Sequence, residues 1–96
     1  MPIVRLIYVT VKPDQTKEAE HIWKTECAPL MIKQPGCLSE QLLKCLDSSG
    51  EYISYAEWDN QENIDRYLAS AAHQEIVSHT RKLRSEKPIV KRYQSV

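Results

Sequence analysis

Hydrophobic positions along the chain follow first the period of a strand and then that of a helix. Residues 3–11 are mainly apolar and β-branched and contain neither Gly nor Pro, which predicts a strand that is covered on both faces. Apolar residues then recur at steps of three and four, as in a helix that buries one face; they are Ala19, Ile22, Trp23, Cys27, Leu30 and Met31. Pro29 removes one helical hydrogen bond, so we expect the last turn of this helix to bend.

The second half of the chain follows the same order of elements without repeating the sequence. Residues 37–46 and 51–58 predict two strands joined by a turn at 47–50. In the second of these, alternate residues face opposite sides, with Ser54 and Trp58 on one side and Ile53 and Tyr55 on the other. A long helical pattern follows, and we expect it to break near Ser70 into two helices. Residues 89–93 predict the last strand.

The order of elements is therefore βαββαβ. Two βαβ units with right-handed crossovers give an α+β, ferredoxin-like fold, in which a four-stranded antiparallel sheet carries its helices on one face. The other sheet face then has no cover and exposes Ile53 and Tyr55. Uncovered apolar faces usually mark interfaces, and a twofold-related copy is the commonest partner. We predict a homodimer joined through the sheet faces.

Length and charge narrow the possible partners. Ninety-six residues predict a single domain over 1–96 with a thin core. Lys plus Arg and Asp plus Glu each number 13, so the net charge is zero and nothing global attracts nucleic acid or an anionic membrane. We find neither a signal-peptide pattern nor an apolar run of membrane-spanning length. We therefore expect a cytoplasmic protein with no membrane or nucleic-acid partner.

Cysteine, histidine and glycine usage argues against bound cofactors. Cys27, Cys37 and Cys45 are odd in number, and the last two are too far apart along one strand for a disulfide. His73 and His79, six residues apart, do not share a helix face, and no pair has metal-ligand spacing. The chain has only two glycines, too few for a Gly-rich phosphate loop. We expect no metal, flavin or other cofactor.

Three side chains with chemical potential converge on the space between helices and sheet. Trp58, Tyr67 and His73 could all point into a pocket there. The alternative is that Trp58 and Tyr67 are core residues and that His73 lies on the surface. Composition and spacing leave both interpretations open.

Three segments in order resemble the antibiotic biosynthesis monooxygenase family. They are 28–39, with Pro35-Gly36-Cys37; 56–62, with Glu57-Trp58; and 67–73, with Tyr67-Leu68 and His73. The resemblance implies a dimeric α/β barrel of ferredoxin-like subunits. Family members include quinol and hydroxyanthrone monooxygenases that need no cofactor, haem-degrading enzymes, and isomerases of small phosphorylated signals.

The resemblance also implies a set of site residues. Trp58 matches the family Trp that borders the pocket, and His73 matches the second His of the helix motif and would accept or donate the proton. The first His of that motif is Tyr67 here, which is followed by Leu68. Hydroxyanthrone oxidisers have an Asn and a Tyr where this chain has Ser54 and Ile64. The catalytic candidates are thus His73, Tyr67 and Trp58, and the substrate-binding candidates are Ser54, Ile64 and Leu68.

These residues favour some family activities over others. The haem-degrading branch uses an Asn in the first strand, and residues 3–11 contain none. The expected function is a cofactor-independent monooxygenase, an oxidoreductase that acts on a small apolar or aromatic molecule of the quinol or anthrone type. The alternatives are a non-catalytic dimer of the same fold, with a ligand-binding or structural role, and an isomerase of the same superfamily.

Overall fold

Four antiparallel strands form one sheet in the order β2-β3-β1-β4. The computed structural model describes residues 1–96, and its strands are β1 (Ile3–Thr10), β2 (Cys37–Lys44), β3 (Glu51–Trp58) and β4 (Ile89–Gln94). The predicted α+β, ferredoxin-like βαββαβ fold is confirmed. The strand β2 ends two residues earlier than predicted, because the chain leaves the sheet at Cys45 and the Leu46 side chain is 92% exposed.

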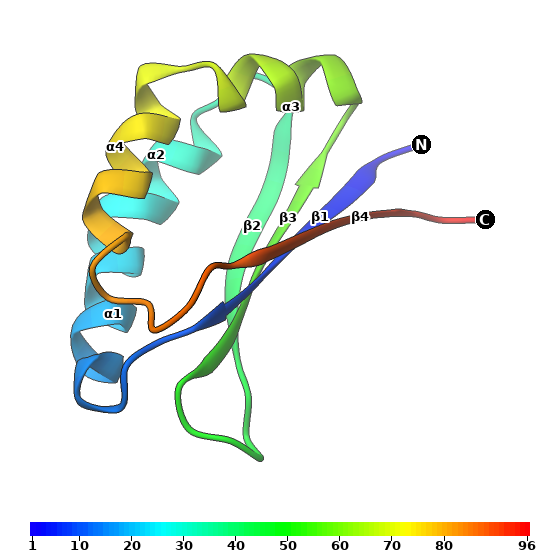
Figure 1. Cartoon of the computed structure of the whole chain (residues 1–96). Coiled ribbons are helices and arrows are strands. Elements are labelled where there is room, and N and C mark those ends of the chain that lie inside the picture. The colour runs from blue at the N-terminus through cyan, green and yellow to red at the C-terminus, as the bar shows by residue number, and fades with distance from the viewer.

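The register of the strands sets which side chains face the helices. In β3, Tyr52, Ser54, Ala56 and Trp58 are buried, and the residues between them are only partly buried, as the alternation predicted. The central pair β1–β3 aligns Arg5 with Ala56 and Ile7 with Ser54. Ile3 pairs with Gln94, so the two chain ends lie at the same end of the sheet (Figure 1).

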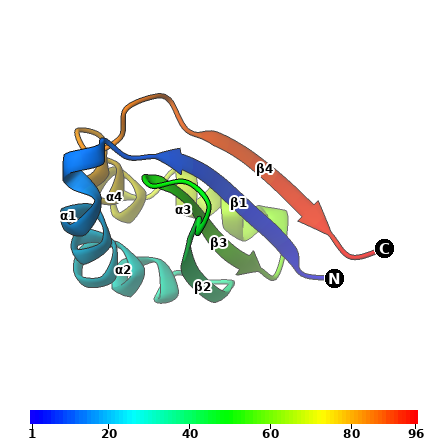
Figure 2. The same ribbon diagram turned by 90° about the horizontal axis from the view of Figure 1, so that it is seen from below.

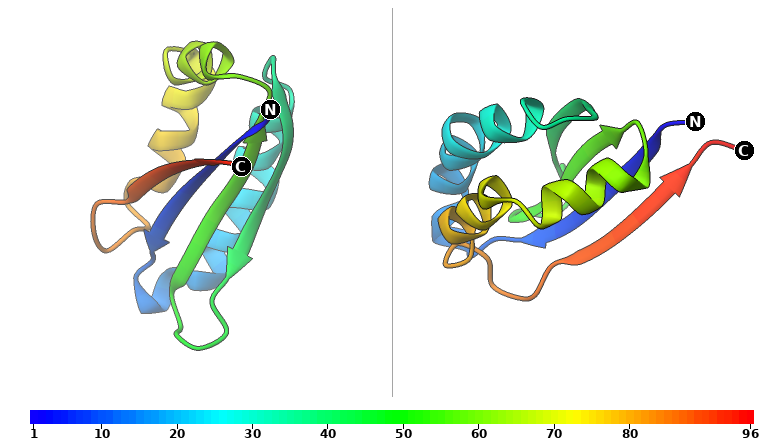
Figure 3. Two further views of the ribbon diagram at one scale, coloured as in Figure 1. Left: turned by 90° about the vertical axis from the view of Figure 1, so that its right-hand side faces the viewer. Right: turned by 90° about the horizontal axis from the view of Figure 1, so that it is seen from above.

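All helices lie on one face of the sheet, as Figures 2 and 3 show. A short 3-10 turn, η1 (Pro13–Gln15), leads into α1 (Thr16–Ile22), which continues through the π-helical turn η2 (Trp23–Cys27) into α2 (Ala28–Ile32). The second helical region consists of α3 (Gln61–Leu68) and α4 (Ala71–Thr80). No helix has the length and the apolar character that crossing a membrane would require.

The distortion caused by Pro29 lies before this residue and not in the last turn of the helix, where we had expected it. Proline cannot donate a backbone hydrogen bond, and its ring clashes with the carbonyl four residues earlier. The chain relieves both effects by widening the preceding turn, so that the Ala28 N–H bonds to the Trp23 carbonyl, five residues back.

The predicted break at Ser70 is present, and its hydrogen bonds explain it. The Ser70 hydroxyl donates to the Tyr67 carbonyl at 2.6 Å and accepts from the His73 N–H at 3.2 Å. Ser70 is thus the N-cap of α4, a position that serine favours. The break places Tyr67 at the end of α3 and His73 in the first turn of α4.

The opposite face of the sheet carries no helix (Figure 2). We call it the open sheet face, and it consists of Val4, Leu6 and Tyr8 of β1, Leu43 of β2, Ile53 and Tyr55 of β3, and Ile89 and Tyr93 of β4. These side chains lie in adjacent register positions, for example Tyr8 opposite both Ile53 and Ile89. The chain therefore leaves a largely apolar sheet surface uncovered, which also carries Gln41, Glu57 and Lys91 opposite Tyr55, Val4 and Leu6.

Candidate functional site

A cavity of about 390 Å³ lies between the helices and the sheet. Its size falls in the range of small-molecule sites, roughly 300–1,000 Å³. The sheet contributes Ile7 and Val9, and one helical wall contributes four residues at steps of four: Ala19, Trp23, Cys27 and Met31. The facing wall comes from α4, with Ile76, Val77 and Thr80. Most of the lining is hydrophobic, so the cavity suits an apolar or aromatic guest.

Four of the six sequence-predicted site residues line this cavity: Ser54, Tyr67, Leu68 and His73. Trp58 and Ile64 are not among the lining residues, and they belong to the core cluster with Met31 and Tyr67. Trp58 is the last residue of β3 and is 0% exposed. The expectation that Trp58 forms the pocket wall is therefore corrected. Its ring packs on Tyr67, with centroids 5.2 Å apart.

Tyr67 and His73 meet edge to face at the polar end of the cavity. Their ring centroids are 5.1 Å apart with an interplanar angle of 75°. Burial lowers the pKa of His73 below 6.5, and the nearby charge of Arg5 lowers this pKa further. The imidazole is therefore neutral at neutral pH and able to accept a proton. His73 is partly buried and lines the cavity.

The Tyr67 hydroxyl has the opposite character. Burial raises the pKa of this phenol to about 12, and Cys27, Cys37 and Glu40 add to the rise, whereas Arg5 opposes it. Tyr67 therefore stays protonated and can donate a hydrogen bond to an oxygen atom in the cavity. A neutral acceptor and a protonated donor thus lie side by side.

Arg5 is the cavity residue that sequence reasoning missed. In the sequence it is a single cation inside an apolar strand, and nothing indicated which face it occupies. The structure places it on the helix-facing side of β1, only 6% exposed, on the cavity wall. None of the ion pairs in the structure involves it. Burial lowers the pKa of Arg5, yet a guanidinium remains charged in proteins.

Glu40 is a partly buried residue whose carboxyl oxygens are buried, and it lies in the same row of the sheet as Arg5. Glu40 pairs with Ala56, and Ala56 pairs with Arg5, so the two charged residues face the helices two strands apart. Both carboxyl oxygens of Glu40 are buried without a hydrogen-bond partner, as is Nε1 of Trp58. Burial raises the pKa of Glu40 to about 7.

This shift makes a prediction for stability. Because the pKa of Glu40 is raised from 4.5 to about 7 in the folded chain, its contribution to stability is full below pH 4.5 and is lost as pH rises through 7. Glu40→Gln keeps the shape without the charge. In the wild type we expect the free energy of unfolding to fall by about 1–2 kcal/mol over this pH range, and in Glu40→Gln we expect this fall to be absent. The figure is smaller than the full pKa shift would give, because the residue is only partly buried and solvent screens part of the effect.

Urea denaturation at about pH 5 and about pH 8 measures this difference. Glu62→Gln is the control, because Glu62 is an exposed carboxylate that pairs with Arg66 on the surface of α3. An equal pH dependence in wild type and Glu40→Gln would show that Glu40 is not the group responsible.

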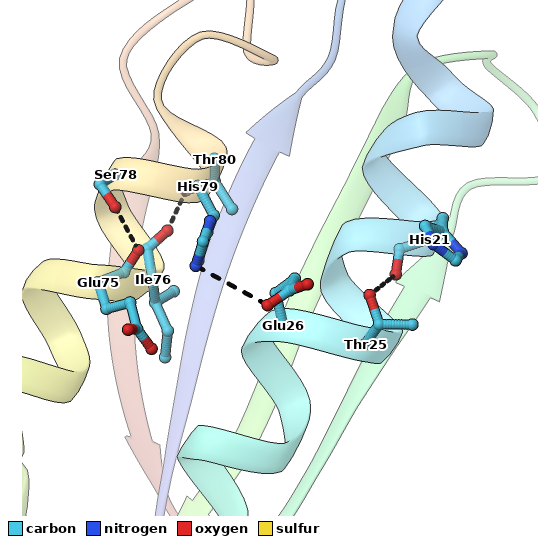
Figure 4. Close-up of polar contacts among 8 residues, drawn as sticks. All are labelled: His21, Thr25, Glu26, Glu75, Ile76, Ser78, His79 and Thr80. Carbon is cyan, nitrogen blue, oxygen red and sulfur yellow. Dashed lines mark hydrogen bonds and ion pairs between the residues drawn. The ribbon is translucent and has the colours of Figure 1, made fainter.

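The remaining histidines lie outside the cavity lining. His79 of α4 points toward η2, where its Nε2 lies 4.0 Å from a carboxylate oxygen of Glu26, and the His21 carbonyl accepts a hydrogen bond from Thr25 (Figure 4). No group of three or more His, Cys, Asp or Glu residues is placed to hold a metal ion. The three cysteines are free thiols. His73 is therefore the one histidine of the cavity, where it lies with Arg5 and Tyr67 among the polar lining residues.

Comparisons with known proteins give one sequence family and one fold. The family described as antibiotic biosynthesis monooxygenase matches residues 2–78. A Bordetella bronchiseptica protein provisionally given that description shares the fold at TM-score 0.90 and 22% identity, over 99% of this chain and 97% of that one. A conserved Methanosarcina mazei protein matches at TM-score 0.90 and 18% identity, over 100% and 94% of the two chains. A Nitrosomonas europaea protein, also provisionally described as such a monooxygenase, matches at TM-score 0.86 and 16% identity, over 98% of each.

These likenesses differ in what they establish. The structural matches are all 22% identical or less, so they show the fold alone. No functionally curated protein matches this chain. The sequence match covers most of the chain, including the residues of the cavity from Arg5 to Val77.

Proposed function

Because the chain belongs to the antibiotic biosynthesis monooxygenase family, we propose that it is a cofactor-independent monooxygenase of a small aromatic molecule of the quinol or anthrone type. One observation carries the proposal: an apolar cavity has a neutral imidazole, His73, and a protonated phenol, Tyr67, in contact at its polar end. Such a pair can remove a proton from an acidic substrate and stabilise the resulting anion.

The proposed reaction needs only the substrate and O₂. His73 takes a proton from the substrate, and the Tyr67 hydroxyl donates a hydrogen bond to the anionic oxygen. The electron-rich anion passes one electron to O₂, and the two radicals combine to form a carbon–oxygen bond. Loss of the second proton with cleavage of the O–O bond leaves a carbonyl and releases water. A CH₂ group thus becomes C=O, with one oxygen atom in the product and the other in water.

The cavity walls have a separate part in this proposal. Apolar side chains keep bulk water from the anion and its radical partner, which strengthens the hydrogen bond from Tyr67 and prevents side reactions. Ser54 and Leu68 contact the substrate as wall residues. Trp58 and Ile64 act from behind, since they hold the Tyr67 ring in place from the core.

A ligand-binding role without catalysis is the second candidate. The observation that favours it is the buried position of Trp58 outside the lining, which leaves its indole N–H unable to contact a ligand in the cavity. In that case the cavity would bind a ligand without catalysing a reaction of it.

We also propose a homodimer joined through the open sheet face. Support comes from the adjacent apolar side chains of all four strands and from the dimeric barrels of the family. The charges at the edges of this face have both signs, with Lys91 near the Tyr8 ring and Glu57 accepting a hydrogen bond from Tyr55. A second copy can therefore pack on it without like-charge repulsion.

Oxygen uptake tests the proposed reaction. We expect the protein to consume O₂ with at least one member of a panel of quinols and anthrones, without added metal or flavin and faster than the protein-free blank. With ¹⁸O₂, an anthrone product should carry one labelled oxygen. Absence of uptake across the panel, together with tight binding of the same compounds, would favour the ligand-binding role instead.

A further inference from the structure

We propose that the cavity binds its aromatic ligand as an anion, with the ionised oxygen group held by the guanidinium of Arg5. This inference rests on the proposed small-molecule role of the cavity but not on the oxygen chemistry. It names a substrate class, an aromatic body with one carboxylate or one ionised hydroxyl group, and it gives a role to a residue that the proposed reaction does not use.

The state of Arg5 is the first argument. The residue is only 6% exposed; its guanidinium nitrogens are not among the fully buried polar atoms without a partner, so the guanidinium still reaches the open space of the cavity that Arg5 lines. A buried cation is normally paired with a carboxylate or fully hydrogen-bonded, because its desolvation is costly. Arg5 forms no ion pair, and the hydrogen bonds of the structure do not include its guanidinium. The five donors of the guanidinium are therefore available to a ligand.

The only buried carboxylate on this side of the sheet cannot serve as the partner. Glu40 lies two strands away, which is roughly 10 Å between Cα atoms at about 4.8 Å per strand. Ala56 lies between the two residues in the register, and Tyr67 packs on Ala56 in the same core cluster. Both carboxyl oxygens of Glu40 lack a hydrogen-bond partner, no ion pair joins Glu40 to Arg5, and Glu40 is not among the cavity residues, so the cation is unpaired.

The surroundings of Arg5 restrict the ligand to a single anionic group. Around Arg5 the cavity has three polar side chains that can act as neutral partners, Ser54, Tyr67 and His73, and the rest of the nearby lining is apolar. The other cation of the lining, Arg84, lies beside Val11 at the far end of β1. Val11 follows Arg5 by six positions, about 20 Å at roughly 3.3 Å per position. One charged end and an apolar body therefore match the cavity.

Equilibrium binding tests this inference without turnover. Trp23 lines the cavity, so its fluorescence reports on an occupant. Under nitrogen, 2-naphthoate should bind at least about tenfold more tightly than neutral 2-naphthamide, because a carboxylate forms paired, charge-assisted hydrogen bonds with a guanidinium. The same comparison is made between ionised 2,4-dinitro-1-naphthol and neutral 1-naphthol. The larger of the two affinity ratios shows whether the site prefers a carboxylate or an ionised hydroxyl group.

Variants identify the group that binds the anion. Arg5→Met should abolish the preference for naphthoate, and it should not lower the melting temperature of the ligand-free protein, since it removes an unpaired buried charge. Arg5→Lys should retain part of the preference, because lysine keeps the positive charge but lacks the paired N–H donors of the planar guanidinium. Arg92→Met is the matched control: Arg92 is the register neighbour of Arg5 on β4, but it is exposed and donates to Gln61.

Each result decides the matter. The inference is supported if the wild type binds either anion more tightly than its neutral counterpart, and if this preference is lost in Arg5→Met and kept in Arg92→Met. Equal binding of naphthoate and naphthamide, no binding of any probe, or loss of the preference in Arg84→Met alone overturns it. If Arg5→Met does not fold, the wild-type preference and Arg5→Lys decide. Absence of O₂ uptake with intact anion preference would refute the proposed oxygenation only, whereas uptake without that preference would refute the anion site only.

Discussion

His73→Ala should lower the turnover of the proposed oxygenase by about 10²–10⁴-fold, the range that a positioned general base contributes. Burial and the charge of Arg5 keep the pKa of His73 below 6.5, so the wild-type imidazole is in its basic form at neutral pH. Activity should fall as pH drops below this lowered pKa, because protonation removes the base. A pH–rate profile of kcat measured by O₂ uptake shows both effects.

The comparison with His79→Ala separates catalysis from helix structure. His79 lies on the same helix, but it pairs with Glu26 outside the cavity lining (Figure 4). The variant His79→Ala should therefore retain wild-type turnover.

Tyr67→Phe keeps the ring that packs on Trp58 and removes only the hydroxyl, so the loss of activity in this variant measures how much the hydroxyl stabilises the anion. Unchanged turnover in His73→Ala would exclude His73 as the base.

Ile53→Lys should abolish the proposed dimer. Ile53 lies at the centre of the open sheet face, between Leu43 and Tyr8 in the register. A lysine there places an unpaired charge inside an apolar interface, at a cost of several kcal/mol, roughly 2–7. In the isolated subunit the same side chain can reach solvent, so the monomer should stay folded by circular dichroism.

Sedimentation at micromolar concentration measures the result. The wild type should sediment near twice 11.1 kDa, and Ile53→Lys should sediment as a monomer. Leu46→Lys is the matched control, because Leu46 is 92% exposed in the β2–β3 turn and lies off the sheet. A wild-type monomer would refute the dimer, and a dimeric Ile53→Lys would place the interface elsewhere.

Local patterning predicted most of the fold. The alternation in 51–58 predicted which residues of β3 face the helices, and the length of the second helical pattern predicted a break near Ser70, where α3 and α4 meet. The position of the helix distortion near Pro29 could not be predicted from the sequence. The sequence shows that a hydrogen bond is lost, but tertiary packing decides which turn widens.

The candidate site was only partly predictable, because it depends on distant pairs. Tyr67 and His73 come together across the predicted break near Ser70, and the structure shows that the Ser70 side chain caps the second helix there. Whether Trp58 borders the cavity or lies behind Tyr67 depends on how α3 packs after β3, and no local pattern contains this. Arg5 and Glu40 share one row of the sheet only through the pairing of three strands. In the sequence these two charged residues are 35 positions apart, and no local pattern relates them.

The π-helical turn η2 has a consequence for how this wall can evolve. In a regular α-helix each step of four residues overshoots a full turn by about 40°, so three steps would rotate Met31 about 120° away from Ala19. Yet Ala19, Trp23, Cys27 and Met31 all line the cavity. The wider turn across Trp23–Cys27 takes up part of this angular drift. Deleting one residue within it would remove about 100° of rotation, but it would also return this turn to α-helical width, and the two changes largely cancel. One residue can therefore be lost or regained in this segment without turning α1 away from the cavity, so the wall can change in length while its lining residues keep facing inward.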